Sequence, residues 1–190
     1  MDKHSEILRA AQHLFGRHGL KKVTTDDIAR EARVSKATIY KTYRNKQEIL
    51  KDVVGHELEE LLSRIRAEVE IQDTVKGQLR AHLLTKISTV HQLVNLHSVS
   101  RESMAEHWGE AQALREQFVQ AEARVLEDIL NKGVEAGELE VPNVKATALF
   151  MVVSLQALEY PWVIEGLNVS VVEQVDLMLE LMMNGLQKRQ

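Results

Sequence analysis

Several residue types are scarce in this chain of 190 residues, and each scarcity excludes a class of protein. There is no cysteine, which excludes disulfides, thiolate metal sites, cysteine nucleophiles and thiol redox sensing. Only two prolines interrupt the chain, and aromatic residues make up 4% of it. Because 44% of the residues are hydrophobic and 27% are charged, the composition predicts a folded, mostly helical protein rather than a disordered one.

Long hydrophobic runs are absent as well. No run reaches the roughly 18–20 residues that cross a bilayer. The longest apolar region, residues 146–158, is interrupted by Thr147, Ser154 and Gln156. The first residues are polar, and residues 7–20 have the spacing of an amphipathic helix rather than of a secretory signal. We therefore expect a cytoplasmic protein with no membrane partner.

The net charge of −4 conceals an asymmetry between two parts of the chain. Residues 1–50 carry 11 Lys and Arg against 6 Asp and Glu, whereas the remaining residues carry 13 against 22. Basic segments of this kind bind polyanions such as nucleic acid, and acidic segments do not. We expect a small basic domain, residues 1–47, joined to a larger acidic domain, residues 48–190.

Apolar residues recur at helical spacing along the whole chain, and no β pattern longer than a few residues interrupts them. Thr24, Ser35 and Asn45 each stand where a capping side chain would begin a helix. Asn45 precedes a long helix whose apolar face extends to Val69. We predict an all-α fold of about nine helices, the others lying at residues 3–18, 25–32, 36–42, 74–97, 101–107, 110–136, 144–160 and 169–188.

Two short helices joined by residues 33–35 form a predicted helix-turn-helix, a motif whose second helix enters the major groove. Ala29, Ile39 and Tyr43 fall on faces that can turn inward, which leaves the other side of the second helix to face DNA. A recognition helix of about two turns contacts only a few base pairs, so specificity requires two copies on one duplex. We expect a homodimer on a double-stranded DNA operator.

Residues 24–50, TTDDIAREARVSKATIYKTYRNKQEIL, carry this motif. They resemble the DNA-binding signature of the tetracycline-repressor (TetR) family of transcriptional regulators. The resemblance implies an amino-terminal domain that binds an operator and a carboxy-terminal domain that binds a small inducer and dimerises through its last two long helices. It predicts a sequence-specific regulator, a repressor that a small-molecule effector releases from a palindromic operator. Residues 133–139 are also similar to the family's usual exit from its seventh helix.

The outward side of the predicted recognition helix offers the chemistry that DNA contacts need. Lysines reach phosphates or guanine acceptors, and hydroxyls donate to phosphates, while carbon surfaces meet thymine methyl groups. Helix N-termini favour phosphate. Arg33 occupies a turn position where the family usually has glycine, and such a position tends to need a positive φ. Capping alone remains an alternative for the first hydroxyls, and solvation alone for the lysines. The expected DNA-binding residues are Thr24, Arg33, Ser35, Lys36, Ala37, Thr38, Tyr40, Lys41, Thr42 and Lys46.

Two further surfaces are expected in the larger domain. The last predicted helix repeats apolar residues at steps of 3 and 4, the spacing of a helix-helix seam, and residues 144–160 are apolar on nearly all sides. The expected dimer interface is Val144, Val152, Leu155, Val172, Val175, Leu179, Met182 and Leu186. One side of the helix predicted at residues 74–97 carries a stripe with several polar groups. Together with aromatic side chains from other segments, this stripe predicts an effector pocket at Leu84, Ser88, His91, Asn95, Trp108, Phe118 and Trp162.

Two other functions fit the sequence less well. A helical-bundle enzyme lacks its usual metal motif here, because no His has Glu three residues before it and no two His are four apart. No nucleotide-binding or nucleophile motif is present either, so we expect no catalytic residue, no metal and no cofactor. A nonspecific architectural DNA binder conflicts with the acidic larger domain, and salt dependence with operator competition distinguishes it from a sequence-specific regulator.

Overall fold

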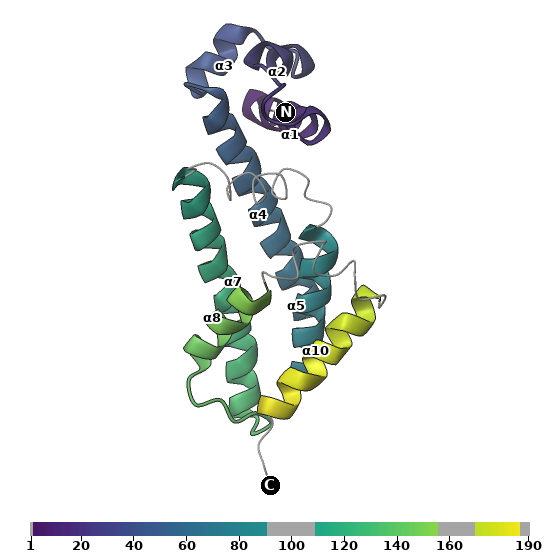
Figure 1. Cartoon of the computed structure of the whole chain (residues 1–190). Coiled ribbons are helices and arrows are strands. Elements are labelled where there is room, and N and C mark those ends of the chain that lie inside the picture. Colours follow the sequence, from purple (N-terminus) through teal and green to yellow (C-terminus); the bar gives the residue numbers. More distant parts are fainter. Residues whose placement is uncertain (1, 91–108, 156–169, 187–190) are drawn as a thin grey trace. The chain divides into compact units, whose positions relative to one another are not determined.

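A computed structural model describes residues 2–90, 109–155 and 170–186 of the chain (Figure 1). These residues form eight helices and no strand, which confirms the all-α prediction. The predicted short helix at residues 101–107 lies outside the described residues. The helices are α1 (Lys3–His18), α2 (Thr25–Glu31), α3 (Lys36–Thr42), α4 (Lys46–Glu70), α5 (Val75–Val90), α7 (Gly109–Glu135), α8 (Val144–Leu155) and α10 (Val171–Leu186).

The chain divides into two compact units. Among the described residues, the first unit contains residues 2–59 and the start of α7 up to Leu114, and the second contains residues 60–90, 115–155 and 170–186. Helix α4 is continuous and contributes its first half to one unit and its second half to the other. The change from one unit to the next therefore falls inside a helix rather than in a linker.

Capping side chains begin the short helices of the first unit, as predicted. Thr24 and Asp27 form a reciprocal box, in which Thr24 Oγ1 accepts from the Asp27 amide at 3.2 Å and Asp27 Oδ2 accepts from the Thr24 amide at 3.0 Å. Ser35 Oγ accepts from the Thr38 amide at 3.1 Å. Asn45 Oδ1 accepts from the Glu48 amide at 2.9 Å and begins α4. These bonds satisfy amides that a helix leaves without partners at its N-terminus.

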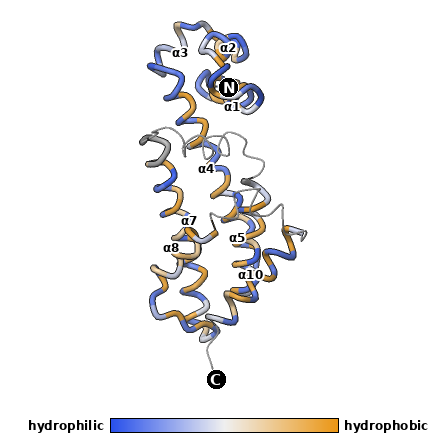
Figure 2. The backbone as a smooth tube through the Cα atoms, viewed as in Figure 1, coloured by the Kyte–Doolittle hydropathy of each residue, from blue (hydrophilic) through white to orange (hydrophobic). Residues whose placement is uncertain are grey.

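The core of the first unit is a set of apolar side chains with at most 3% of their surface exposed. They come from α1 to α4 and from the turn before α2: Ile7, Ala11, Phe15, Val23, Ile28, Ile39, Tyr43, Ile49, Leu50, Val53 and Val54. Figure 2 shows such apolar positions recurring along the helices between hydrophilic ones. Burial of this one face fixes which side of each short helix remains for solvent.

In the second unit, α5 and α10 lie side by side (Figure 1). Arg80 of α5 donates to both carboxylate oxygens of Asp176 of α10, at 2.6 and 3.1 Å. Gly137, with a φ of 72°, follows the end of α7 where the sequence predicted its stop. Helix α8 is apolar on nearly all sides and was expected to lie between its own domain and something else; Phe150 is 72% exposed and Val153 is 52% exposed. One apolar face of α8 is therefore open in the single chain.

Candidate DNA interface and effector site

Helix α3 separates a buried face from an exposed one. Ile39 and Tyr43 are 0% and 3% exposed, whereas Tyr40 is 50% exposed. The neighbouring α2 contributes Ala29 to the same buried side. The remaining α3 side chains that the sequence assigned to DNA are exposed, except for the half-buried Thr38; they are Lys36, Ala37, Lys41 and Thr42. The structure thus presents a polar, cationic helix face to solvent.

The exposed face of α3 is organised by contacts with α2. Lys36 Nζ lies 2.7 Å from Asp26 Oδ1 and 6.0 Å from the centre of the Tyr40 ring. The hydrogen bond with Asp26 raises the pKa of the Lys36 ammonium, which is therefore held charged. The Tyr40 hydroxyl lies 3.2 Å from Thr25 Oγ1. These contacts orient the two long side chains before any ligand arrives.

Thr25 is a candidate that the sequence analysis missed. Its hydroxyl lies beside that of Tyr40, and it is the first residue of α2, where the helix dipole favours an anion. Its place after a capping Thr was the available signal. The hydroxyls of Thr24 and Ser35, by contrast, already serve their helices as caps.

Arg33 adopts the left-handed conformation expected for the turn, with a φ of 54°. It is the only non-glycine residue with positive φ in the described part of the chain. This conformation costs a residue with a Cβ roughly 1–2 kcal/mol relative to glycine. The Arg33 side chain is exposed, on the turn that leads into α3.

Lys46 has a structural contact that the sequence analysis did not predict. Its Nζ donates to the carbonyl oxygens of Leu20 and Val23, at 2.6 and 2.8 Å. The ammonium therefore attaches the first turn of α4 to the segment between α1 and α2. These bonds use two of the three donors of the ammonium, and the contact of Lys46 with phosphate stays a prediction.

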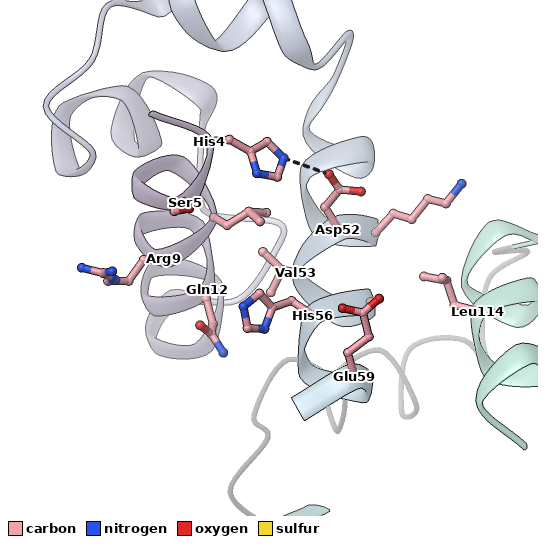
Figure 3. A pocket seen from close by; sticks show the side chains of 12 residues that line it. His4, Ser5, Arg9, Gln12, Asp52, Val53, His56, Glu59 and Leu114 are labelled. Atoms are coloured by element: carbon pink, nitrogen blue, oxygen red, sulfur yellow. Dashed lines mark ion pairs between the residues drawn. The ribbon is translucent and has the colours of Figure 1, made fainter. Parts of the chain in front are cut away.

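A cleft of about 610 Å³ lies between α1 and α4 in the first unit (Figure 3). His4, Arg9 and Gln12 come from α1, and Asp52 and Glu59 come from α4; His4 points toward Asp52, whereas Arg9 points away from α4. Groups of both signs line the cleft: His4, Arg9 and Lys51 are basic, whereas Asp52 and Glu59 are acidic.

The second unit contains a buried ionic cluster that joins α5 to α7. Lys86 Nζ donates to Glu122 Oε2 at 2.8 Å, and His82 Nε2 lies 3.1 Å from Glu122 Oε1. Lys86 is 1% exposed, and Glu122 and His82 are both 0% exposed. The His82 ring is not aligned for a hydrogen bond, and its Nδ1 also has none. Buried polar groups without partners are uncommon and mark this cluster as a functional candidate.

The charge state of Glu122 follows from two opposing effects. Burial raises the pKa of this carboxyl, but the Lys86 ammonium and the His82 imidazole outweigh burial, so that its pKa lies below the usual range. Glu122 is therefore ionised, and Lys86 balances its charge. Removing either partner of a buried ion pair of this kind strongly destabilises the fold.

The polar stripe predicted for the effector pocket is displaced on α5. Ser88 is exposed, and its hydroxyl donates to the carbonyl of Leu84 in its own helix at 2.6 Å. The buried polar stripe consists instead of Gln78, His82, Lys86 and Thr89. Leu84 and Phe118 are half-buried, while His91, Asn95, Trp108 and Trp162 lie outside the described residues.

The predicted dimer seam stays a prediction, and four of its eight residues are buried within the single chain. The structure buries Val152, Leu155, Val175 and Leu179 to 4% exposure or less within their own chain, because they pack in the core of the second unit. Val144 and Met182 are half-buried, and the side chain of Leu186 is not among those described. Of the predicted set, Val172 is clearly exposed, at 48%. The open apolar positions are Leu149, Phe150 and Val153 on α8 and Val172, Leu177 and Leu181 on α10.

The described residues contain neither a cluster of metal ligands nor a helix that could span a membrane. No group of three or more His, Cys, Asp and Glu side chains there has an arrangement that could hold a metal ion. No described helix is both long and apolar enough to span a bilayer.

A capped helix-turn-helix with one buried and one exposed cationic face, followed by a second helical unit, defines a DNA-binding transcriptional regulator. The sequence profile of the bacterial regulatory proteins of the tetR family matches residues 7–53. The HTH-type transcriptional regulator YdeS of Bacillus subtilis is 32% identical over 139 residues, covering 72% of this chain and 67% of that protein. The chain belongs to the tetR family.

Two further relationships extend over nearly the whole chain. The fatty acid metabolism regulator protein of Bacillus subtilis is 21% identical over 188 residues, which covers 98% of this chain and 97% of that protein. The crystal structure of the transcriptional regulator FadR from Bacillus subtilis in complex with stearoyl-CoA is similar with a TM-score of 0.75, covering 95% of this chain and 98% of that one. This structural likeness, at 21% identity, establishes the same fold.

Proposed function

We propose that the protein is a repressor that binds a palindromic operator as a homodimer and is released by a small-molecule effector. The observation that carries this proposal is the exposed cationic face of α3 opposite the buried Ile39 and Tyr43. Lys36 and Lys41 contact phosphates or guanine, and Thr42 donates to phosphate oxygens. The other proposed DNA contacts are Thr24, Thr25, Arg33, Ser35, Ala37, Thr38, Tyr40 and Lys46. No step in this proposal requires catalysis.

Selection of bound duplexes from random-sequence DNA tests the proposal. A palindromic motif is expected, with half-sites separated by a multiple of about 34–36 Å. Replacing Lys41 by Ala should weaken binding of the selected duplex. The same replacement at Lys132, an exposed lysine of α7, should not weaken it. If no motif is recovered, and the affinity depends on salt concentration but not on DNA sequence, the result would instead support a nonspecific DNA binder.

The open apolar faces of α8 and α10 support the homodimer. Phe150 and Leu181 are 72% and 76% exposed, which is unusual for large apolar side chains in the absence of a partner. Two copies of each helix around a twofold axis would form a four-helix interface and cover these faces. Because a regulator of this kind acts where its DNA operator lies, we propose a cytoplasmic location.

For the effector we propose a long-chain fatty acyl-CoA, bound within the second unit. The relative whose structure contains stearoyl-CoA shares the fold along nearly the whole chain. The interior of the second unit combines apolar side chains with the single described ionic cluster of His82, Lys86 and Glu122, and small-molecule sites have this composition. The cluster provides the polar group that would orient the thioester end of the effector.

Calorimetric titration with stearoyl-CoA tests the effector proposal, with coenzyme A alone as the control. Stearoyl-CoA is expected to bind and to release the selected duplex, while coenzyme A does neither. Binding of both to the same extent, or of neither, would refute an acyl-CoA effector and leave the DNA-binding proposal intact.

A further inference from the structure

Tyr43 occupies a central position in the first unit. It directly follows α3, it is 3% exposed, and its ring stacks on the His4 ring with 5.9 Å between centres and 22° between planes. Its backbone amide donates to the Ile39 carbonyl at 2.9 Å and so closes the last turn of α3. The side chain and the main chain of one residue therefore connect the recognition helix to its surroundings.

The Tyr43 hydroxyl joins two other helices. It donates to Asp52 Oδ2 of α4 at 3.0 Å, and His4 Nε2 of α1 lies 2.8 Å from the same hydroxyl oxygen. Because the single phenol proton goes to the carboxylate, His4 Nε2–H must donate to the Tyr43 oxygen. Burial and the neighbouring Asp52 raise the pKa of Tyr43, so the phenol stays protonated and keeps its donor.

Two contacts attach α4 to the rest of the unit at different places. Near its start, Lys46 donates to the carbonyls of Leu20 and Val23, and these bonds do not involve α3. Further along, Gln12 of α1 donates to Glu57 at 3.1 Å, again without α3. Among the side-chain hydrogen bonds described in this unit, those of Tyr43 link α3 to both α1 and α4. Figure 3 shows His4 and Asp52 facing each other across the cleft between these helices.

We propose that the Tyr43 hydroxyl is a positioning group that fixes the recognition helix to α1 and α4, so that α3 moves with α4 as one body. Tyr43 itself is buried and does not touch DNA; it acts through the orientation of α3. Without its hydroxyl, α3 keeps its apolar packing through Ile39 and the phenyl ring but loses both bridging bonds. The cost then appears in DNA affinity and in the local opening of α3 rather than in the fold.

The test is Tyr43→Phe in the full-length protein. We expect the affinity for the duplex selected from random-sequence DNA to fall about five- to tenfold, because Tyr43→Phe loses the bonds to Asp52 and His4, both of which are half-exposed. Amide hydrogen exchange at residue 43 should become about fivefold faster, because α3 opens more often. The circular dichroism spectrum should not change.

A double-mutant cycle identifies the pathway. Asp52→Ala removes one of the two bonds and should cause most of the loss seen in Tyr43→Phe, and the two substitutions together should cause no more than Tyr43→Phe alone. Asp52→Asn keeps a carbonyl acceptor for the phenol and should retain most of the affinity. Gln12→Met is the matched control, since it removes a bond between α1 and α4 that does not involve α3; DNA affinity should then stay within twofold of wild type.

Three results would overturn the proposal. The first is wild-type DNA affinity and exchange rates in Tyr43→Phe. The second is a loss in the double variant that equals the sum of the single losses. The third is a loss in Gln12→Met as large as that in Tyr43→Phe, which would mean that any bond between α1 and α4 matters equally. None of these results depends on the identity of the effector.

Discussion

Replacing Lys86 by methionine leaves the Glu122 carboxylate buried without the ammonium that balances it. Glu122 is 0% exposed, so water cannot take the place of the lost partner at the 2.8 Å contact. Removing one member of a buried ion pair costs about 3–5 kcal/mol. In a chain of this size, that loss corresponds to a Tm lower by roughly 10 °C.

Two further variants distinguish the cost of an unpaired buried charge from the cost of losing an exposed ion pair. Lys86→Met combined with Glu122→Met replaces the pair by apolar side chains of similar volume, and we expect most of the stability to return. Arg80→Met is the matched control, because it breaks the exposed pair between Arg80 of the same helix and Asp176. An exposed pair contributes about 0–1 kcal/mol, so its loss should be small.

The dependence on pH supplies an independent check. The pKa of Glu122 is lowered in the folded protein, so its contribution is complete above the ordinary value of 4.5 and is lost as the pH falls toward the folded value. Lys86→Met removes the chief cause of this lowering. The variant should therefore lose less stability on acidification below pH 4.5 than the wild type loses.

Equilibrium urea denaturation, followed by far-ultraviolet circular dichroism, measures these effects. The protomer concentration must be held constant, because the stability of a dimer depends on it. A loss below about 1 kcal/mol for Lys86→Met would refute the reasoning, since the pair would then behave as an exposed one. A double variant less stable than the single one would also contradict it.

Three other substitutions test separate parts of the protein. Arg33→Gly should stabilise the fold by about 1 kcal/mol in urea denaturation. The same variant should bind DNA more weakly, and the salt dependence of binding should fall by about one phosphate contact. Equal or tighter DNA binding would count against a phosphate contact by Arg33. Phe150→Glu should yield monomers in sedimentation at micromolar concentration, whereas Ile71→Glu should leave the dimer intact. Thr24→Ala should lower the Tm by roughly 3 °C while Thr24→Ser does not, as calorimetry can show.

The fold was predictable because its signals are local. The bounds of α1 and α3 agree with the predicted residues 3–18 and 36–42, since a capping side chain or a terminal glycine marks the helix ends. Thr24 and Ser35 accept the amide bonds that their positions implied. The inward turn of Tyr43 followed from helical spacing alone. Each of these features depends on residues within a few positions of one another.

The sites were predicted less completely because they depend on contacts between distant residues. Two polar stripes run along α5 at the same spacing, and the sequence does not show that the one with His82 and Lys86 turns inward. Glu122, their partner, lies 36 residues beyond Lys86. Similarly, an apolar seam on α10 does not show whether Val175 and Leu179 pack on their own chain or on a second copy. No local pattern directs Lys46 to the carbonyls between α1 and α2.

The continuity of α4 limits how an effector can act on DNA binding. Its apolar stripe is buried in both units, with Ile49 and Val53 in the first and Leu61 and Ile65 in the second. An effector in the second unit shifts the position of α4 only to the extent that it binds one arrangement better than the other. A hundredfold weakening of operator binding requires about 2.7 kcal/mol of such preference. If α3 moved freely against α4, part of that free energy would not reach the recognition helix, and the role that we propose for Tyr43 is to limit this loss.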